Sequence, residues 1–198
     1  MSLNNDKTAL SHASTFEVDT RLKSWNLPLE QWLLAIGKTF GNIDGVCTSS
    51  MVFNEEGRIL MVQRASTDSM PNKWEVPGGA VDIDDASILA GAARELMEEA
   101  GLKAKRFNYE VATGPDEKFG RLFMNSRRTR SFCRVVFDVD VESCEDVKLD
   151  PKEHQDFAWV MEDEVRKEKI GGRAIPITHV TMQALILEAL GLRKEMGG

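Results

Sequence analysis

Three glutamates stand close together in the stretch RELMEEAGL, namely Glu95, Glu98 and Glu99. In a helix, residues three and four apart lie on the same face, so these carboxylates would be neighbours. Like charges at this spacing repel one another and weaken an isolated helix. Protonation, an arginine or a divalent cation would relieve the repulsion, and a cation favours the charged carboxylates. The cluster therefore indicates either a solvated acidic surface or a metal site.

The sequence around the glutamates predicts a helix with defined ends. An apolar stripe on a different face recurs at helical spacing and can be buried: Ile88, Ala92, Leu96 and Ala100. Asp84 and Asp85 lie at the expected start, where acidic side chains cap free N–H groups. Gly101 follows the last turn and suits a left-handed C-cap. Because Arg94 points about 100° away from Glu95 around the helix, we expect it to hold the preceding loop rather than to neutralise the cluster.

The stretch from Pro77 to Leu102 resembles the Nudix box, G-x5-E-x7-R-E-U-x-E-E-x-G-U, where U is a bulky aliphatic residue. RELMEEAGL matches the second half of this pattern completely. WEVPGG, just before it, resembles the strand and turn that lead into the box. A pattern with this many fixed positions is specific. The resemblance implies an α/β protein with the Nudix fold, an α/β/α sandwich with a mixed β-sheet.

The first half of the box departs from the pattern. Counted from Gly79, Asp85 stands where the glutamate belongs, but eight residues rather than seven then separate it from Arg94. Counting back from Arg94 reaches Ala86 instead. The loop carries one extra residue, and the usual glutamate is either replaced by Asp85 or lost. Because that glutamate is thought to brace the loop in the family, the departure bears on loop geometry more than on chemistry.

The resemblance also implies an activity and a site. Nudix hydrolases use water to cleave a phosphoanhydride bond of a nucleoside diphosphate linked to another moiety. Mg²⁺, with Mn²⁺ as a substitute, is the implied cofactor, since Mg²⁺ prefers oxygen ligands and leaves room for phosphate oxygens. Glu98 and Glu99 are the implied metal ligands, and Glu95 is a third ligand or the base. The Gly79 carbonyl is an additional ligand, and Arg94 orients the loop or Glu95.

Residues outside the box extend this expected site. Glu153, in DPKEHQDFAWV, suits the further acidic residue that a separate loop often supplies in the family. His154 beside it can act as a base, because its reference pKa is near neutrality, although both can equally be ordinary loop residues. Arg64 resembles an arginine that meets phosphates in relatives. A basic cluster can also reach an anionic substrate, or form a solvated hairpin tip: Arg127, Arg128 and Arg130.

The remaining sequence predicts the elements around this helix. Residues 46–53 and 58–63 flank NEEG, whose Gly57 suits a tight turn, so we predict a β-hairpin. Further strands are predicted at WEVP, which we expect to place Trp74 in the core, and at 106–113, 131–141 and 156–161. Helices are predicted from Pro28, in PLEQWLLAIGKTF, and over 178–196 with Thr178 as N-cap.

Composition limits the partners. A formal net charge of −7 without a basic stripe argues against DNA or other nucleic acid as an electrostatic partner. No apolar run is long enough to span a membrane, and the polar start lacks the apolar centre of a secretory signal. Cys47, Cys133 and Cys144 lack paired spacing, so we expect reduced thiols and a cytoplasmic protein.

The chain organises as an N-terminal extension, 1–40, and a Nudix domain, 41–198, and the extension is a candidate surface for a homodimer. Three other functions stay open at this point. The chain can be an inactive Nudix-fold module that binds and senses a nucleotide, which the irregular loop favours and the complete RELMEEAGL does not. It can be an isomerase of prenyl diphosphates, for which Cys47 is thin support. Lastly, the acidic helix can be purely structural.

Overall fold

A computed structural model describes residues 16–35, 39, 42–112, 121–125 and 127–196. The polar start of the chain, Ile36 of the first predicted helix and Thr113 of one predicted strand lie outside these residues. In chain order the elements are β1 (Glu17–Val18), η1 (Thr20–Trp25), α1 (Leu29–Ala35), β2 (Gly45–Met51), β3 (Ile59–Arg64), β4 (Trp74–Glu75), α2 (Ile88–Ala100), β5 (Ala104–Glu110), β6 (Leu122–Met124), β7 (Ser131–Val141), β8 (His154–Val160), α4 (Glu162–Lys167), β9 (Lys169–Ile170), β10 (Arg173–Ala174) and α5 (Val180–Glu195).

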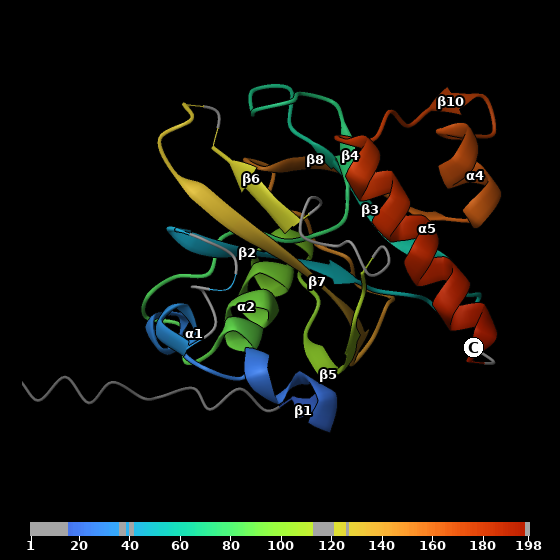
Figure 1. Ribbon diagram of the computed structural model, residues 1–198. Coiled ribbons are helices and arrows are strands. Elements are labelled where there is room, and N and C mark those ends of the chain that lie inside the picture. Colours follow the sequence, from blue (N-terminus) through green and yellow to red (C-terminus); the bar gives the residue numbers. More distant parts are fainter. Residues whose placement is uncertain (1–15, 36–38, 40–41, 113–120, 126, 197–198) are drawn as a thin grey trace, which may run out of the picture.

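Two β-sheets form the centre of the fold, and α2 and α5 pack on different sides of them (Figure 1). The first sheet has the order β1-β5-β7-β2, with β6 on β7, and the second has the order β4-β3-β8. The first sheet is mixed, because β2 runs parallel to β7 whereas β5 runs antiparallel to it. The predicted α/β/α architecture with a mixed sheet is therefore confirmed.

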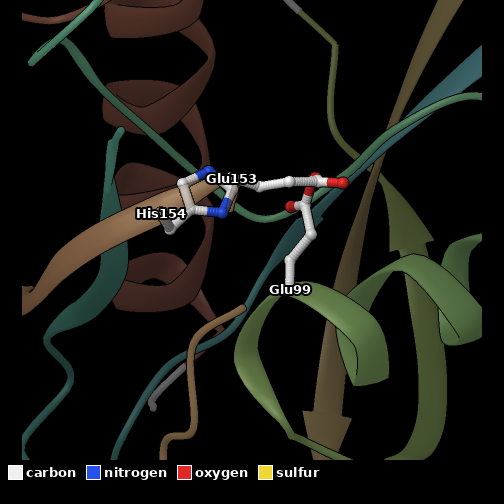
Figure 2. A group of neighbouring side chains, drawn as sticks. All are labelled: Glu99, Glu153 and His154. Carbon is white, nitrogen blue, oxygen red and sulfur yellow. The ribbon is translucent and has the colours of Figure 1, made fainter. Parts of the chain in front are cut away.

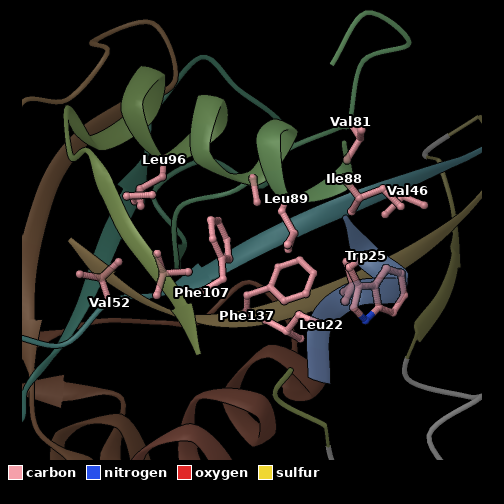
Figure 3. Close-up of a cluster of buried hydrophobic side chains, with 14 of the residues drawn as sticks. Leu22, Trp25, Val46, Val52, Val81, Ile88, Leu89, Leu96, Phe107 and Phe137 are labelled. Carbon is pink, nitrogen blue, oxygen red and sulfur yellow. The ribbon is translucent and has the colours of Figure 1, made fainter. Parts of the chain in front are cut away.

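The apolar face of α2 is buried against the first sheet. Ile88, Leu89 and Leu96 lie between the helix and the strands, facing Phe107 of β5 and Phe137 of β7 (Figure 3). The whole predicted stripe of α2 is fully buried. Burying a large apolar side chain contributes about 1.5–3 kcal/mol, so this packing fixes the rotation of the helix. Its acidic face must consequently point away from the sheet.

The predicted hairpin exists only near its turn. Asn54 N–H donates to the Arg58 carbonyl at 3.0 Å, and Gly57 closes the turn at φ 71°. Beyond the turn the two strands separate, because β2 joins β7 in one sheet and β3 joins β8 and β4 in the other. The other edge of β2 is occupied by residues 77–81, which bond along it. Pairing partners from distant segments therefore override the local hairpin pattern.

The described part of the N-terminal extension packs into the domain. β1 adds to the sheet as a parallel edge strand beside β5. Trp25 and Trp32 stack with ring centroids 5.0 Å apart, and Trp32 is 0% exposed. The aromatic residue of α1 thus belongs to the core.

The C-terminal helix begins one residue later than predicted. His179, rather than Thr178, is the N-cap of α5, and its ring Nδ1 accepts a hydrogen bond from Thr181 N–H at 3.2 Å. Near the other end, Arg193 donates two hydrogen bonds of 2.8 Å to Asp138 of β7, whose side chain is fully buried. This charged pair joins the end of the helix to the first sheet.

Two further expectations concern single residues. Trp74 is fully buried in the second cluster of core residues, as predicted, and is not free to stack on a base. Burial raises the pKa of the Cys47 and Cys133 thiols to about 11, so neither is an activated nucleophile.

Within the described segments, no helix has the length and apolar character needed to cross a membrane.

Candidate active site

The acidic helix α2 has a different start from the one expected. Its N-cap is Ser87, whose hydroxyl accepts a hydrogen bond from Ala90 N–H at 3.1 Å, and not Asp84 or Asp85. The extra residue of the loop places both aspartates ahead of the first turn. The expected C-cap is present, since Gly101 adopts φ 68°. The helix therefore presents Glu95, Glu98 and Glu99 from its central and last turns.

Asp85 instead binds Arg94. Arg94 donates to the two carboxylate oxygens of Asp85 at 3.0 and 2.9 Å and to the Ala80 carbonyl at 3.0 Å. Asp85 also accepts a hydrogen bond of 2.8 Å from Asp82 N–H. A two-point guanidinium–carboxylate contact is strong and directional. These bonds tie the loop to the helix, which is the bracing function expected of the missing box glutamate.

Arg94 also contacts the acidic cluster, including Glu95 as the resemblance implies, whereas its angular position on the helix predicts contacts with the loop rather than with the cluster. Its Nη1 lies 2.8 Å from Glu95 Oε1 and 3.0 Å from Glu98 Oε2. The long side chain reaches back across the helix surface, so its position in the helix wheel does not limit its contacts. Arg94 thus fixes the orientation of two carboxylates and compensates part of their charge.

The double glycine before the loop lets the backbone pass close to these carboxylates. A Cβ on Gly79 would lie 2.5 Å from Glu95 Oε2, and one on Gly78 would overlap the Thr48 carbonyl. Gly78 has φ 154°, which other residues rarely adopt. The Gly79 carbonyl accepts a hydrogen bond of 2.8 Å from Thr48 N–H and a long one of 3.5 Å from the Thr48 hydroxyl.

Glu99 is the most buried carboxylate of the cluster, with 6% of the residue exposed. Its Oε2 accepts a hydrogen bond of 2.7 Å from Gly78 N–H. Burial, together with the nearby carboxyls of Glu153 and Glu75, raises the pKa of Glu99 to about 9, although the hydrogen bond from Gly78 opposes this. Burial also raises the pKa of Glu95 above its ordinary value, although the Arg94 contacts oppose this.

A second element brings further ligand atoms to Glu99. Glu153 directly precedes β8 and His154 begins it, and both extend toward Glu99 of α2 (Figure 2). One ligand atom from each of these three residues lies within 4.8 Å of the other two. A buried carboxylate next to a second carboxylate is unfavourable without a cation. The donor set of this cluster therefore fits a divalent metal ion.

Arg64 lies beside this cluster but has partners of its own. At the end of β3, its guanidinium forms ion pairs with Glu75 and Asp68 and donates to the Ser69 carbonyl at 2.6 Å. Glu75 in turn lies 3.7 Å from His154 Nε2. The arginines of the basic cluster, in contrast, are exposed in the turn between β6 and β7: Arg127, Arg128 and Arg130.

Sequence reasoning missed an aromatic group on the same side of the molecule. Phe123 of β6 stacks on Phe132 of β7, with ring centroids 5.7 Å apart at an angle of 25°. The Arg134 guanidinium lies 4.8 Å from the centre of the Phe123 ring. Alternation in RSFCRVVF signals that Phe132 and Arg134 share one strand face. Nothing in the local sequence, however, assigns Phe123 to the strand beside them.

The pairing of β7 with β2 places these aromatic rings near the glycine loop. Arg134 pairs with Cys47 of β2, and Cys47 forms a bridge with Ala80, directly after Gly79. The charges of Arg134 and Glu95 both act on the pKa of the Cys47 thiol, in opposite directions. The aromatic pair, the guanidinium and the carboxylates therefore belong to one neighbourhood.

Known proteins resemble this chain in sequence. A family model described as the NUDIX domain matches residues 45–179. A MutT-like protein of Streptomyces ambofaciens is 30% identical over 123 residues, or 62% of this chain and 68% of that protein. The CTP pyrophosphohydrolase of Escherichia coli (strain K12) is 26% identical over 132 residues, or 66% of this chain and 87% of that protein. The chain therefore belongs to the Nudix family and is a Nudix hydrolase.

Solved structures agree on the fold. The crystal structure of a MutT protein from Methanosarcina mazei Go1 has a TM-score of 0.54 at 23% identity, covering 76% of this chain and 95% of that one. An Ap4A hydrolase of C. elegans has a TM-score of 0.55 at 16% identity, covering 76% of this chain and 98% of that one.

Proposed function

We propose that this hydrolase cleaves a phosphoanhydride bond in a nucleoside diphosphate linked to another moiety, such as a nucleoside triphosphate, ADP-ribose or a sugar nucleotide. The observation that carries the proposal is the convergence of Glu99 with Glu153, next to the glycine loop and two further carboxylates of α2. A cation would stabilise the charged form of these carboxylates. Metal-assisted phosphoryl transfer requires the same combination of oxygen ligands and water.

Mg²⁺, with Mn²⁺ as substitute, is the proposed cofactor. Glu98, Glu99 and Glu153 would hold it, with the Gly79 carbonyl as a further ligand. When bound, the ion neutralises charge on the non-bridging phosphate oxygens. Glu98 is exposed, at 60% of its side chain, so a substrate can reach it from solvent.

Glu95 is the residue that we assign as general base. Burial raises its pKa above the ordinary value, which is the direction that makes a carboxylate a stronger base toward water. The contact of 2.8 Å from Arg94 holds one oxygen in place, and the other faces Gly79. Arg94 therefore acts as a positioning residue, while Glu95 receives the proton.

The aromatic group gives the nucleoside a place to bind. Phe123 is only half-buried on its stacked partner Phe132, so an unpaired base can stack on this pair. Arg134 can contact the anionic phosphates, and Arg64 is a second candidate for this contact. The carboxylate cluster and the aromatic pair would then hold the two ends of one substrate.

The test is turnover by the full chain, with and without Mg²⁺, on a panel of nucleoside triphosphates, ADP-ribose, sugar nucleotides and dinucleoside polyphosphates. CTP heads the panel because the E. coli relative is a CTP pyrophosphohydrolase. In ¹⁸O-labelled water, we expect metal-dependent cleavage with one labelled oxygen in a phosphate product. Metal binding without turnover on any substrate would favour the inactive nucleotide-binding module instead.

The cytoplasmic location and the homodimer belong to the same proposal. Cys47, Cys133 and Cys144 are free thiols, which suits a reducing compartment. A homodimer would use the surface of the N-terminal extension, where Leu34 of α1 is 73% exposed. Light scattering that finds only the mass of one chain would contradict the dimer.

A further inference from the structure

His154 is a buried side chain with unused binding capacity. It is 2% exposed, and neither ring nitrogen has a hydrogen-bond partner among the described residues. A buried polar group without a partner costs about 1–3 kcal/mol. Glu75 Oε1, at 3.7 Å from Nε2, is too distant for a hydrogen bond. The fold thus retains an imidazole whose local environment does not satisfy it.

The groups next to this ring are the carboxyl groups of acidic residues. A ring nitrogen of His154 and carboxylate oxygens of Glu99 and Glu153 lie within 4.8 Å of one another, and Figure 2 shows the ring beside both carboxylates. An imidazole nitrogen and two carboxyl groups that converge in this way can act as ligands of one cation. Ligand atoms on one ion with bonds of about 2.1–2.3 Å lie roughly 3 Å apart when adjacent and roughly 4.4 Å apart when opposite, so these side chains must move closer together to share it.

We infer that His154 supplies a nitrogen ligand to the cation site of Glu99 and Glu153, and that this nitrogen makes the site select Mn²⁺ over Mg²⁺. Imidazole suits transition-metal ions, whereas Mg²⁺ binds almost exclusively to oxygen. The catalytic use of the ion rests on the proposed function, whereas the binding of the ion to His154 does not. Its test therefore needs no substrate.

The direct test is pulsed electron paramagnetic resonance of the full chain loaded with Mn²⁺ alone. We expect modulation from a directly bound ¹⁴N nucleus in the wild type and its loss in His154→Gln. The control is His179→Asn, which keeps a capping side chain on α5 and should leave the spectrum unchanged. A wild-type spectrum without ¹⁴N coupling, or a coupling that persists in His154→Gln, would overturn the inference.

Affinity gives an independent measurement. By calorimetric titration, His154→Gln should weaken Mn²⁺ binding about tenfold and Mg²⁺ binding by less than about threefold. An equal loss for both ions would mean that His154 only supports the fold, and would contradict a nitrogen ligand. Circular dichroism checks that the variant is folded. If the variant does not fold, the electron paramagnetic resonance spectrum of the wild type alone decides whether a nitrogen binds the ion. Failure of turnover alone would contradict the proposed function and leave these results unaffected.

Discussion

At the scale of one residue, Glu99 shows how burial disfavours the charged form of a carboxylate in the absence of a cation. Burial raises its pKa to about 9, from an ordinary value of 4.5. Between these values the folded, metal-free protein binds more protons than the unfolded chain does. The free energy of unfolding must therefore fall as the pH rises through this window.

This predicts a difference between wild type and Glu99→Gln in the presence of a chelator. Between about pH 5.5 and about pH 8, wild type should lose on the order of 1–3 kcal/mol more stability than the variant, measured by urea unfolding. Exposed Glu188→Gln is the matched control and should follow the wild type. Identical pH dependence in wild type and Glu99→Gln would refute this account of Glu99.

The pairing of Asp85 with Arg94 marks a limit of sequence reasoning at this scale. The spacing identifies Glu95, Glu98 and Glu99 as neighbours, since helical geometry is regular. Asp85 lies in a loop with one residue more than the family pattern, and its partner depends on the path of that loop. The folded path of the loop brings both of its oxygens to the guanidinium.

The loop before α2 carries the next prediction, at the scale of elements. Gly79→Ala places a methyl group against the end of the Glu95 side chain, which can move, so the fold should survive. Displacing the proposed base should lower kcat about tenfold or more, with a change of melting temperature of only a few degrees. Gly172→Ala, whose Cβ would meet nothing within 4 Å, is the control. Unchanged kcat in Gly79→Ala would exclude Glu95 as the base.

The β6–β7 hairpin provides a test of substrate binding. Phe123→Ala removes the outer ring of the aromatic pair and should raise KM for the best nucleotide substrate about tenfold, since stacking contributes about 1–3 kcal/mol per base. Its effect on kcat should be small. Met124→Ala, at an exposed neighbouring position of β6, should change neither constant. Equal kinetic constants for the two variants would mean that the nucleobase of the substrate binds elsewhere.

Elements were easier to predict than their pairing. Residues 131–141 form a strand over the predicted length, because strong alternation and β-branched residues fix it locally. The prediction that β2 and β3 form a hairpin was wrong beyond the turn, since β7 and residues 77–81 occupy the two edges of β2. A local pattern does not contain the identity of a distant partner strand.

At the scale of the whole molecule, the N-terminal segment is part of the core although it precedes the residues matched by the family. Trp32→Ala should therefore destabilise the protein by about 3–5 kcal/mol, as large-to-small changes in a core do. Leu34→Ala, on the exposed side of the same helix, should cost less than about 0.5 kcal/mol. Chemical unfolding of the two variants checks this, and similar stabilities would show that the segment only covers the domain.

The central claim is that the acidic face of α2 carries the hydrolysis. The most direct measurement is metal-dependent turnover of the best substrate by wild type and Glu98→Gln, because Glu98 is exposed and its replacement spares the core. We predict a fall in kcat of at least about a hundredfold with an unchanged melting temperature. Turnover in Glu98→Gln within about twofold of the wild type would contradict the account.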